Sequence, residues 1–281
     1  MRSTELHRRV FESGSKTYFN SSLFFPPDVR DDVFILYGFV RIADDFVDAV
    51  PQRPDDFHAF VSAYRRALEG DPANDVIIDS FVDLARRKEF DPAWTEAFLH
   101  SMELDLEKNV HATLDETLEY VYGSAEVIGL YMSRLMDLST EADEAACMLG
   151  RAMQFINFIR DIDEDNGLGR IYLPISESTL ADLREETARA HPQEFVRFLT
   201  AQLDRYRSWQ RVAETGYRYI PRRYRVPIMT AADMYNWTAA TIEADPFVVF
   251  RRKVKPSRPR IVSRIVRNSF ASGPSMKAAS R

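Results

Sequence analysis

The stretch from Val33 to Asp48 reads VFILYGFVRIADDFVD, an apolar run that ends in three aspartates. A helix formed by these residues is apolar on nearly every face, which is typical of a helix in the protein interior. Asp44 and Asp48 lie four residues apart, so such a helix places their side chains on one face, about 5–6 Å apart. Two carboxylates at that distance repel each other by roughly 3 kcal/mol at an effective dielectric near 20. The stretch therefore predicts a buried helix whose acidic end binds a hard divalent cation.

A second acidic cluster lies in a segment rich in Phe and Ile, between residues 154 and 165. Its polar side chains recur every three or four residues and form one helical stripe: Gln154, Asn157, Asp161 and Asp165. Asp163 and Glu164 fall on other faces, where we expect them to be solvated. An arginine accompanies each cluster, Arg41 in the first and Arg160 in the second. Two carboxylate sets with arginines indicate a clamp for Mg²⁺ and a diphosphate.

Helices are the secondary structure that the whole sequence favours. The chain has 281 residues but only 10 glycines, too few for the many turns of a β-sandwich, and no segment alternates like a hairpin strand. Capping residues mark several helix starts, at Asp28, Asp91, Thr113 and Thr140. We expect helices over about 29–50, 92–109, 113–137 and 140–165, with shorter ones at 55–69, 75–88, 178–190, 192–215 and 224–243. The prediction is a single all-α domain over residues 1–255, followed by a basic tail at 256–281.

Charge and cysteine content restrict the ligands and the compartment. The net charge is −6 and no basic stripe crosses the body of the chain, which argues against nucleic acid as the main ligand. One cysteine, Cys147, cannot form an intramolecular disulfide, which fits a reducing compartment. The first residues lack the apolar core of a signal peptide, and no apolar run reaches the ~20 residues that span a bilayer. We therefore expect a cytoplasmic protein that is soluble or peripheral on a membrane.

The end of the chain differs from its body in charge. Residues 251–281 hold ten Lys or Arg and no acid. Within this segment a helix would place four apolar side chains on one side, Ile261, Val262, Ile265 and Val266, with most basic ones opposite. That pattern is typical of a short interfacial helix, so the tail is expected to contact a membrane surface.

These motifs together resemble the squalene/phytoene synthase family, over about Ser15 to Arg252. Residues 15–19, SKTYF, resemble the flap motif of that family, and 37–48 its first aspartate motif, D-D-x-x-D. Residues 120–129, YVYGSAEVIG, resemble its Y-x-Y-x-x-A-G-x-V-G helix. Residues 154–165, continued by GRIYLP at 169–174, resemble its second aspartate motif, N-x-x-R-D-x-x-x-D. The departures from the pattern are Gly14 in place of a histidine, Glu126 in place of a glycine, and Phe155 and Ile156 in place of Leu or Thr.

The resemblance implies a helical bundle around an apolar cavity, with Asp44 and Asp48 facing Asp161 and Asp165 across its mouth. Three Mg²⁺, with Mn²⁺ as a substitute, would be held by the oxygen ligands Asp44, Asp48, Asn157, Asp161 and Asp165. Diphosphate contacts would come from Ser15, Thr17, Tyr37, Arg41, Gln154, Asn157, Arg160, Tyr235 and Arg252. Tyr120 would line the cavity, where its ring could stabilise a carbocation.

The implied reaction joins two isoprenyl diphosphates head to head. The leading interpretation is condensation of two C20 diphosphates to phytoene through a cyclopropylcarbinyl diphosphate. It is favoured by the small side chain of Ser22, which by analogy lies near the deep end of the cavity. The alternative uses two C15 diphosphates and gives presqualene diphosphate, dehydrosqualene or squalene, in the last case with a nicotinamide cofactor. A non-catalytic assembly protein of the family would have lost the paired aspartates, and the oligomeric state stays open.

Overall fold

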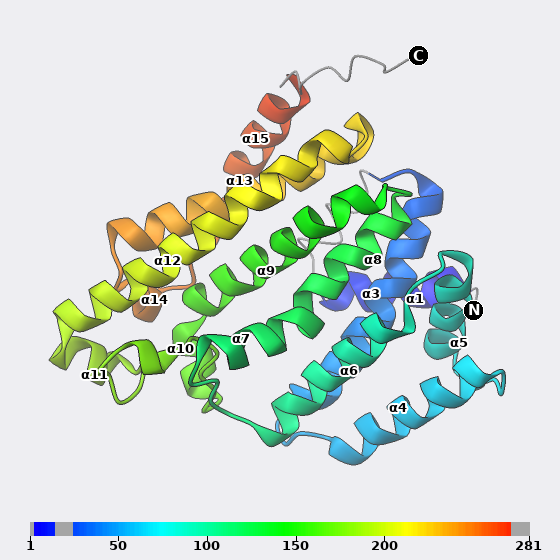
Figure 1. The fold of residues 1–281 in the computed structure, drawn as a ribbon, viewed down its shortest axis with the longest axis horizontal. Coiled ribbons are helices and arrows are strands. Elements are labelled where there is room, and N and C mark those ends of the chain that lie inside the picture. The colour runs from blue at the N-terminus through cyan, green and yellow to red at the C-terminus, as the bar shows by residue number, and fades with distance from the viewer. Residues whose placement is uncertain (1–2, 15–24, 271–281) are drawn as a thin grey trace. The chain divides into compact units, whose positions relative to one another are not determined.

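Helices form along nearly the whole chain in the computed structural model, which describes residues 3–14 and 25–270 (Figure 1). No strand occurs in these two segments, and one isolated parallel bridge joins Val110 to Ile171. The prediction of an all-α fold is therefore confirmed. The chain divides into two compact units, Met1–Lys108 with Leu130–Leu138 and Asn109–Gly129 with Ser139–Arg281. The predicted division at residue 255 stays a prediction.

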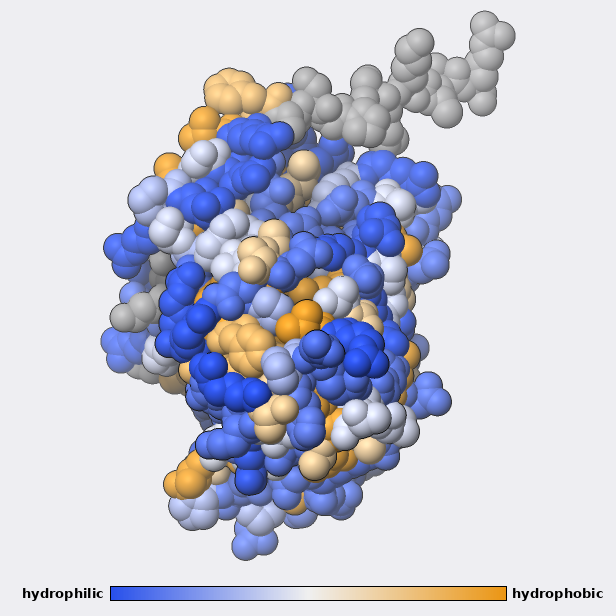
Figure 2. Space-filling model, turned by 90° about the vertical axis from the view of Figure 1, so that its left-hand side faces the viewer, coloured by the Kyte–Doolittle hydropathy of each residue, from blue (hydrophilic) through white to orange (hydrophobic). Residues whose placement is uncertain are grey.

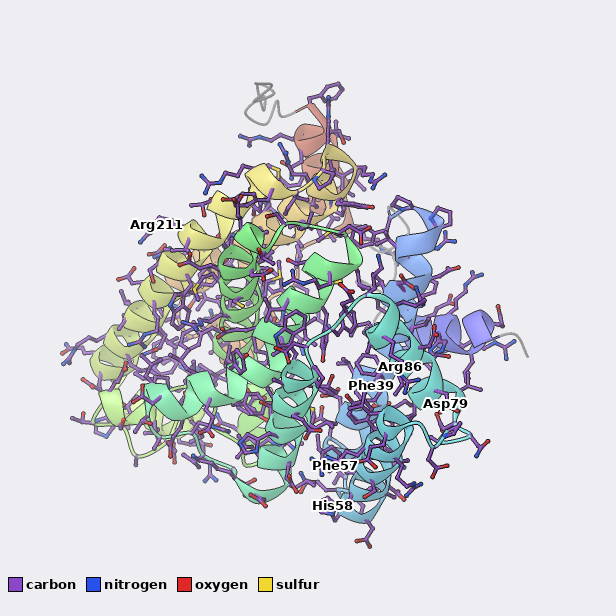
Figure 3. The ribbon with its side chains drawn as sticks, turned by 45° about the vertical axis from the view of Figure 1, so that its right-hand side comes forward. Phe39, Phe57, His58, Asp79, Arg86 and Arg211 are labelled. Carbon is purple, nitrogen blue, oxygen red and sulfur yellow. The ribbon has the colours of Figure 1, made fainter. Side chains whose placement is uncertain are left out.

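The first unit contains five helices within the described residues: α1 (Ser3–Gly14), α3 (Pro27–Val47), α4 (Pro54–Glu69), α5 (Val76–Arg87) and α6 (Pro92–Glu107). Its core is aromatic. Phe39 on α3 is fully buried (Figure 3). Its ring stacks on Phe81 of α5, with 3.9 Å between centroids, and meets Tyr64 of α4 edge-on. The apolar stretch that we predicted to be interior is therefore at the centre of this unit.

The ends of α3 differ from the sequence prediction by a few residues. The helix begins at Pro27, so Pro26 rather than Asp28 occupies the N-cap position. It ends at Val47 rather than Val50, because a residue before proline is disfavoured in the helical region and Pro51 follows Val50. Predicted capping at the start of α6 is confirmed, since the side chain of Asp91 accepts a hydrogen bond from the Ala93 N–H (2.9 Å).

The second unit holds most of the remaining helices: α7 (Leu114–Val121), η1 (Tyr122–Glu126), η2 (Thr140–Ala142), α9 (Asp143–Arg160), α10 (Ile162–Gly167), η3 (Ile175–Glu177), α11 (Glu185–Ala190), α12 (Pro192–Thr215), η4 (Gly216–Tyr219), α13 (Arg222–Ala244), α14 (Val248–Arg251) and α15 (Arg258–Phe270). Helix α8 (Val127–Leu135) begins in this unit and ends in the first. Helix α12 packs along α9, and α15 packs against α13 (Figure 1). No helix in the described part is long and apolar enough to cross a membrane.

Two of the long helices that we predicted are interrupted. The capping box at Thr113 and Glu116 is confirmed, but five residues, Tyr122–Glu126, form a π-helical turn between α7 and α8. The segment expected at 140–165 begins with a 3-10 turn capped by Ser139 and breaks at Asp161, whose φ of −100° and ψ of 16° lie outside the helix. A π turn inside an α-helix is often found at a functional site.

A third prediction, a helix over 178–190, is confirmed only for α11. The residues before it are irregular because side chains satisfy their backbone groups. Asn166 donates to the Leu183 carbonyl (2.8 Å), and the Arg184 N–H donates to Asp182 (3.0 Å). Local hydrogen bonds of this kind compete with helix formation.

Two glycines set the distance between η1–α8 and α9. A Cβ added at Gly129 would lie 2.3 Å from the Ala146 carbonyl oxygen, and one added at Gly150 would lie 2.2 Å from the Ala125 carbonyl oxygen. Both contacts are with backbone, which cannot swing away. The small residues Ala125 and Gly129 therefore serve the close approach of two helices.

Candidate metal and diphosphate site

The first aspartate cluster occupies the last turns of α3. Nη1 of Arg41 donates to Oδ2 of Asp44 (2.8 Å), and the same guanidinium forms an ion pair with Asp45. Burial, together with the nearby negative charge of Asp48 and against the opposing effect of Arg41, raises the pKa of Asp44 to about 7. This carboxyl group is thus held in a place where its ionised form is unfavourable without a further cation.

The helix itself adds to this electrostatic cost. Asp48 is the C-cap of α3, and its N–H bonds the Asp44 carbonyl (2.9 Å), so the aspartates gather at the carboxyl end of the helix. The last carbonyl groups of a helix carry partial negative charge, which disfavours anions and favours cations. A bound cation would relieve both the repulsion between carboxylates and this interaction.

The end of α1 packs on the start of the same cluster. Tyr37 stacks on Phe11, with 3.8 Å between ring centroids, and burial raises the pKa of its hydroxyl. A Cβ at Gly14 would lie 2.5 Å from the Tyr37 hydroxyl oxygen and 3.3 Å from Cδ of Arg41. Glycine at position 14 therefore lets the backbone of α1 lie directly against these two predicted diphosphate ligands.

The next residues along the chain are the predicted flap. Ser15 and Thr17, like Ser22, lie outside the described residues. Their predicted contacts with diphosphate and cavity stay predictions.

The second cluster lies across the junction of α9 and α10. The Asp161 N–H bonds the Asn157 carbonyl (2.8 Å) and the Asp165 N–H bonds the Asp161 carbonyl (2.9 Å), so helical hydrogen bonding continues through the break. Arg160 binds both carboxylate oxygens of Asp161, with 2.8 Å from Nε to Oδ1. This two-pronged geometry is the one in which arginine also binds phosphate.

Asn157 supplies the most specific sign of a missing ligand. Its Oδ1 is buried, and among the residues that the structure describes it meets no hydrogen-bond donor. A buried carbonyl oxygen without a partner is costly, so such atoms normally bind a donor, a water or an ion. An amide oxygen beside carboxylates is a ligand type that Mg²⁺ accepts.

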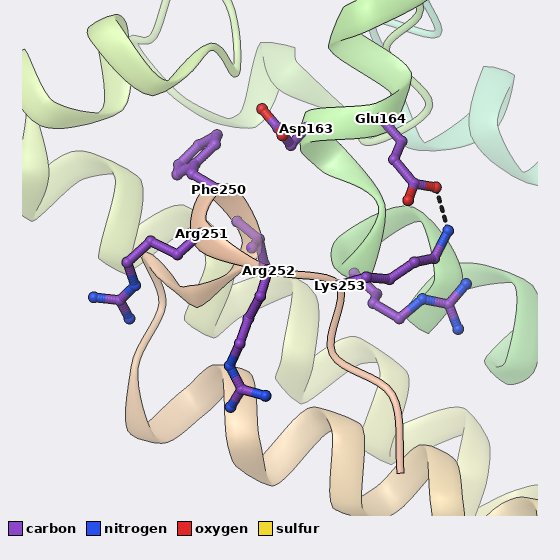
Figure 4. A pocket seen from close by; sticks show the side chains of 8 residues that line it. Asp163, Glu164, Phe250, Arg251, Arg252 and Lys253 are labelled. Atoms are coloured by element: carbon purple, nitrogen blue, oxygen red, sulfur yellow. Dashed lines mark hydrogen bonds and ion pairs between the residues drawn. The ribbon is translucent and has the colours of Figure 1, made fainter. Parts of the chain in front are cut away.

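A lysine that the sequence analysis missed joins this cluster. Nζ of Lys253 lies 3.4 Å from Oδ1 of Asp161 and forms an ion pair with Glu164 (Figure 4). Glu164 is exposed as predicted, yet it is paired rather than only solvated. The only sequence feature that could have identified Lys253 was the basic run Arg251-Arg252-Lys253, in which we predicted a diphosphate contact for Arg252 but not for Lys253.

Around this lysine lies a small pocket of about 120 Å³. Its lining is rich in charge and includes Arg160, Asp163, Glu164, Arg252 and Lys253. Arg251 forms an ion pair with Asp245 and is thereby engaged elsewhere, whereas Arg252 is exposed at the pocket. Arg160 and Lys253, which both contact Asp161, and Arg252 give this pocket basic side chains suited to an anion.

The other predicted residues of the second unit lie on neighbouring helices. Gln154 is half-buried on α9, and Tyr235 is half-buried on α13, which packs against α9. Tyr120 is buried in an aromatic cluster, where it packs against His111, Phe158 and Tyr172 at centroid distances of 5.2, 6.0 and 5.0 Å. Tyr122 is 42% exposed, as expected for tyrosines two apart on a helix.

Glu126, the most conspicuous departure from the family pattern, is compensated by its surroundings. Its buried carboxylate accepts a hydrogen bond from Nε of Arg151 (2.7 Å). The Arg151 guanidinium also lies over the ring of Trp209, 5.3 Å from its centroid. A buried charge with a good partner is tolerated, so this substitution leaves the helix packing intact.

Neither cluster forms a complete metal site from protein side chains alone. Within residues 3–14 and 25–270, no three His, Cys, Asp or Glu side chains converge on one point. Each cluster supplies two aspartates on one helical stripe, and its arginine occupies part of their oxygens. Such a site suits a cation that keeps waters and shares substrate oxygens, as Mg²⁺ does.

The sequence of the chain is similar to those of known proteins. The family model described as Squalene/phytoene synthase matches residues 11–260. The chain is 31% identical to a phytoene synthase of Rhodobacter capsulatus over 267 residues (91% of this chain, 78% of that protein) and 29% identical to a 15-cis-phytoene synthase of Paracoccus sp. over 255 residues (87% and 84%).

Solved structures agree in fold. A squalene synthase of Alicyclobacillus acidocaldarius superposes with a TM-score of 0.78 at 21% identity, covering 87% of this chain and 94% of that one. A dehydrosqualene synthase in complex with ligand gives 0.78 at 22% identity and covers 95% of both. The chain belongs to the squalene/phytoene synthase family.

Proposed function

We propose that this protein is a phytoene synthase, a prenyltransferase that condenses two geranylgeranyl diphosphates head to head. The observation that carries the proposal is the presence of both aspartate motifs, intact, in a chain whose curated relatives include several phytoene synthases at 28–31% identity. One diphosphate leaves as the cyclopropylcarbinyl intermediate forms. The second leaves when that intermediate rearranges to phytoene, and each half-reaction releases a proton.

Members of this family generally use a divalent metal. For this chain we propose Mg²⁺, three ions per site, held by Asp44, Asp48, Asn157, Asp161 and Asp165. The raised pKa of Asp44 and the unpartnered oxygen of Asn157 support this assignment. When bound, the metal supplies positive charge to the diphosphate leaving group, which makes C–O cleavage feasible at neutral pH.

The basic side chains beside the aspartates are proposed to bind the diphosphates. Arg41 and Arg160 present planar donor groups that match phosphate oxygens in pairs. Lys253 adds a positive charge 3.4 Å from Asp161. The contacts are completed by polar side chains from the flap and the neighbouring helices: Ser15, Thr17, Tyr37, Gln154, Tyr235 and Arg252.

The apolar surroundings are proposed to protect the carbocations. Water would quench an allylic or cyclopropylcarbinyl cation, so the reacting carbons must be kept dry. Tyr120, in its cluster with Phe158 and Tyr172, offers an aromatic face that attracts positive charge. The C40 product is insoluble in water, which is why we also propose that the enzyme is located in the cytoplasm and works at a membrane face.

A squalene-type reaction with two C15 diphosphates is the second candidate, because the two solved structures named above are a squalene synthase and a dehydrosqualene synthase. The two are separated by incubating the protein with C15 or C20 diphosphate and Mg²⁺, with and without NADPH, and analysing the extracted hydrocarbons by mass spectrometry. We expect phytoene from the C20 substrate, independent of NADPH. Exclusive formation of C30 products would overturn the phytoene assignment, and no product from either substrate would favour a non-catalytic role.

A further inference from the structure

Helix α15 is held against α13 in a defined orientation. The buried side chain of Asn268 donates hydrogen bonds to Oγ1 of Thr230 (3.2 Å) and Oδ2 of Asp233 (2.9 Å). Near the end of α15, Arg222 donates to the Ser269 carbonyl (3.2 Å). These contacts fix which side of α15 faces α13 and which side faces outward.

The outward side differs from the one expected from the sequence. Ile261 and Ile265 are half-buried on the same side as Asn268, whereas Val262 and Val266 are exposed. The four apolar residues that we had grouped on one face are therefore divided between two. An α-helix has 3.6 residues per turn, so when Asn268 faces α13 the residues at 262, 266 and 270 face outward.

The outward residues form an apolar stripe. Val262, Val266 and Phe270 are spaced four residues apart and are 58%, 52% and 80% exposed. Hydrophobic surface is visible at the top of the view in Figure 2, the level at which α15 lies in Figure 1. A contiguous exposed apolar patch on a folded protein commonly marks a site of interaction.

The charged side chains of α15 itself are all basic. Helix α15 contains Arg258, Arg260, Arg264 and Arg267 and no acidic residue. Two more exposed arginines, Arg222 and Arg223, begin α13, where Arg222 reaches the end of α15. An apolar stripe bordered by arginines is the composition of a helix that lies in the interface of an anionic bilayer.

A second copy of the chain is a less suitable occupant. In a symmetric dimer the same surface meets itself. Pairing two α15 helices through this stripe would bring their arginines together with no acid on either helix to neutralise them. Lipid headgroups with negative charge provide that neutralisation, and acyl chains cover the valines and the phenylalanine.

We propose that the outward face of α15, formed by Val262, Val266 and Phe270 with Arg258 and Arg267, docks the protein on an anionic lipid bilayer. This inference depends on the proposed function in one respect, the purpose of docking, which is to pass a water-insoluble hydrocarbon into lipid. Binding itself depends on this surface and is measurable without substrate.

The test is co-sedimentation of the full-length protein with vesicles of phosphatidylcholine, with or without phosphatidylglycerol, at low and high salt. We expect binding to the anionic vesicles that weakens as salt rises. Val266→Asp and Phe270→Asp should each lower the partition coefficient at least tenfold, and Arg267→Glu should reduce its salt dependence. Val196→Asp, at a valine that is 37% exposed near the start of α12, is the control and should bind like wild type.

Far-UV circular dichroism and thermal melting of each variant establish that it is folded, and the exposed positions chosen make unfolding unexpected. Wild-type binding by folded Val266→Asp and Phe270→Asp would overturn the proposal, as would absence of wild-type binding or equal binding to neutral vesicles. Self-association of the wild type in sedimentation velocity, abolished by the same variants, would assign the face to a dimer instead. The proposed function is tested separately, by measuring hydrocarbon formation in detergent. A failure of vesicle binding therefore does not imply a failure of the proposed function, or the reverse.

Discussion

The two aspartate clusters differ in how the protein compensates their charge. The cluster on α3 lies inside one continuous helix and at its carboxyl end, where the backbone repels anions. The cluster at Asp161 lies across a helix break, and its later acids, Asp163 to Asp165, fall in the first turn of α10, where the backbone attracts them. One arginine serves Asp44 and Asp45, whereas Arg160 and Lys253 both reach Asp161.

The difference indicates a division of roles between the clusters. On α3 the carboxylates remain under-compensated, so binding of a cation there gains the most electrostatic energy. At the α9–α10 junction the carboxylate is already paired, so a metal must displace basic side chains, which then become available to diphosphate. Metal capture is thus expected mainly from the first cluster and substrate recognition mainly from the second.

Removal of one aspartate from either cluster should have the largest effect. Asp44→Asn and Asp161→Asn are each expected to lower turnover roughly a thousandfold, because each removes charge stabilisation that the leaving group requires. Asp55→Asn, which changes an exposed acid in the first turn of α4, is the matched control and should stay within about twofold. Product formation at saturating Mg²⁺, with circular dichroism as a check of folding, measures the effect. Near-normal turnover of either stripe variant would contradict the clamp.

The free energy of unfolding of the metal-free protein should respond differently to a substitution in each of the two clusters. The pKa of Asp44 is raised from 3.8 to about 7, so the folded state holds a proton that the unfolded state releases, and stability falls as pH rises from about 4 to 7. The side chain is 32% exposed, so we expect Asp44→Asn to stabilise the protein at pH 8 by about 1–2 kcal/mol, less than the full shift would give. The gain should vanish by pH 4–5.

Asp161→Asn should instead destabilise the metal-free protein at pH 8, because it breaks the pairs with Arg160 and Lys253. Urea unfolding in EDTA at pH 5 and pH 8 compares both variants with wild type. Equal behaviour of the two variants at pH 8 would show that the clusters are electrostatically alike.

A smaller effect is expected from the lysine of the second cluster. Lys253→Met should lower kcat/KM about tenfold, mainly through the KM for the isoprenyl diphosphate, since it removes one charged contact of the kind worth about 1.5–3 kcal/mol. Lys255→Met, two residues further and exposed, should change neither constant. A loss confined to kcat, or an equal loss in both variants, would argue against a direct role in substrate binding.

Some of these features could be predicted from the sequence because they depend on local spacing. The apolar run before Asp44 requires an interior helix, and four-residue spacing places its aspartates together, whatever surrounds them. The capping box of Thr113 and Glu116 is likewise formed between residues three apart. These predictions are confirmed because the periodicity of a helix is sufficient to make them.

Other features depend on contacts that spacing cannot show. Lys253 and Glu164 are 89 residues apart in the sequence, so no local pattern predicts their contact. The outward face of α15 was assigned incorrectly because Asn268, a polar residue, packs inward on Thr230 and Asp233. The helix breaks at Asp161 without an adjacent proline or glycine to signal the break.

The wide turn at Tyr122–Glu126 has a consequence for insertions and deletions. A π turn accommodates one more residue than the α-helix around it. Deletion of one of these five residues can therefore restore a regular helix while the residues that follow keep nearly the same rotation and position, so Gly129 would stay against the Ala146 carbonyl. A deletion in a regular turn of α7 or α8 would instead rotate everything that follows by about 100° and shift it by about 1.5 Å. Loss of one residue between Val121 and Val127 is therefore expected to disturb the fold less than a deletion elsewhere in these helices.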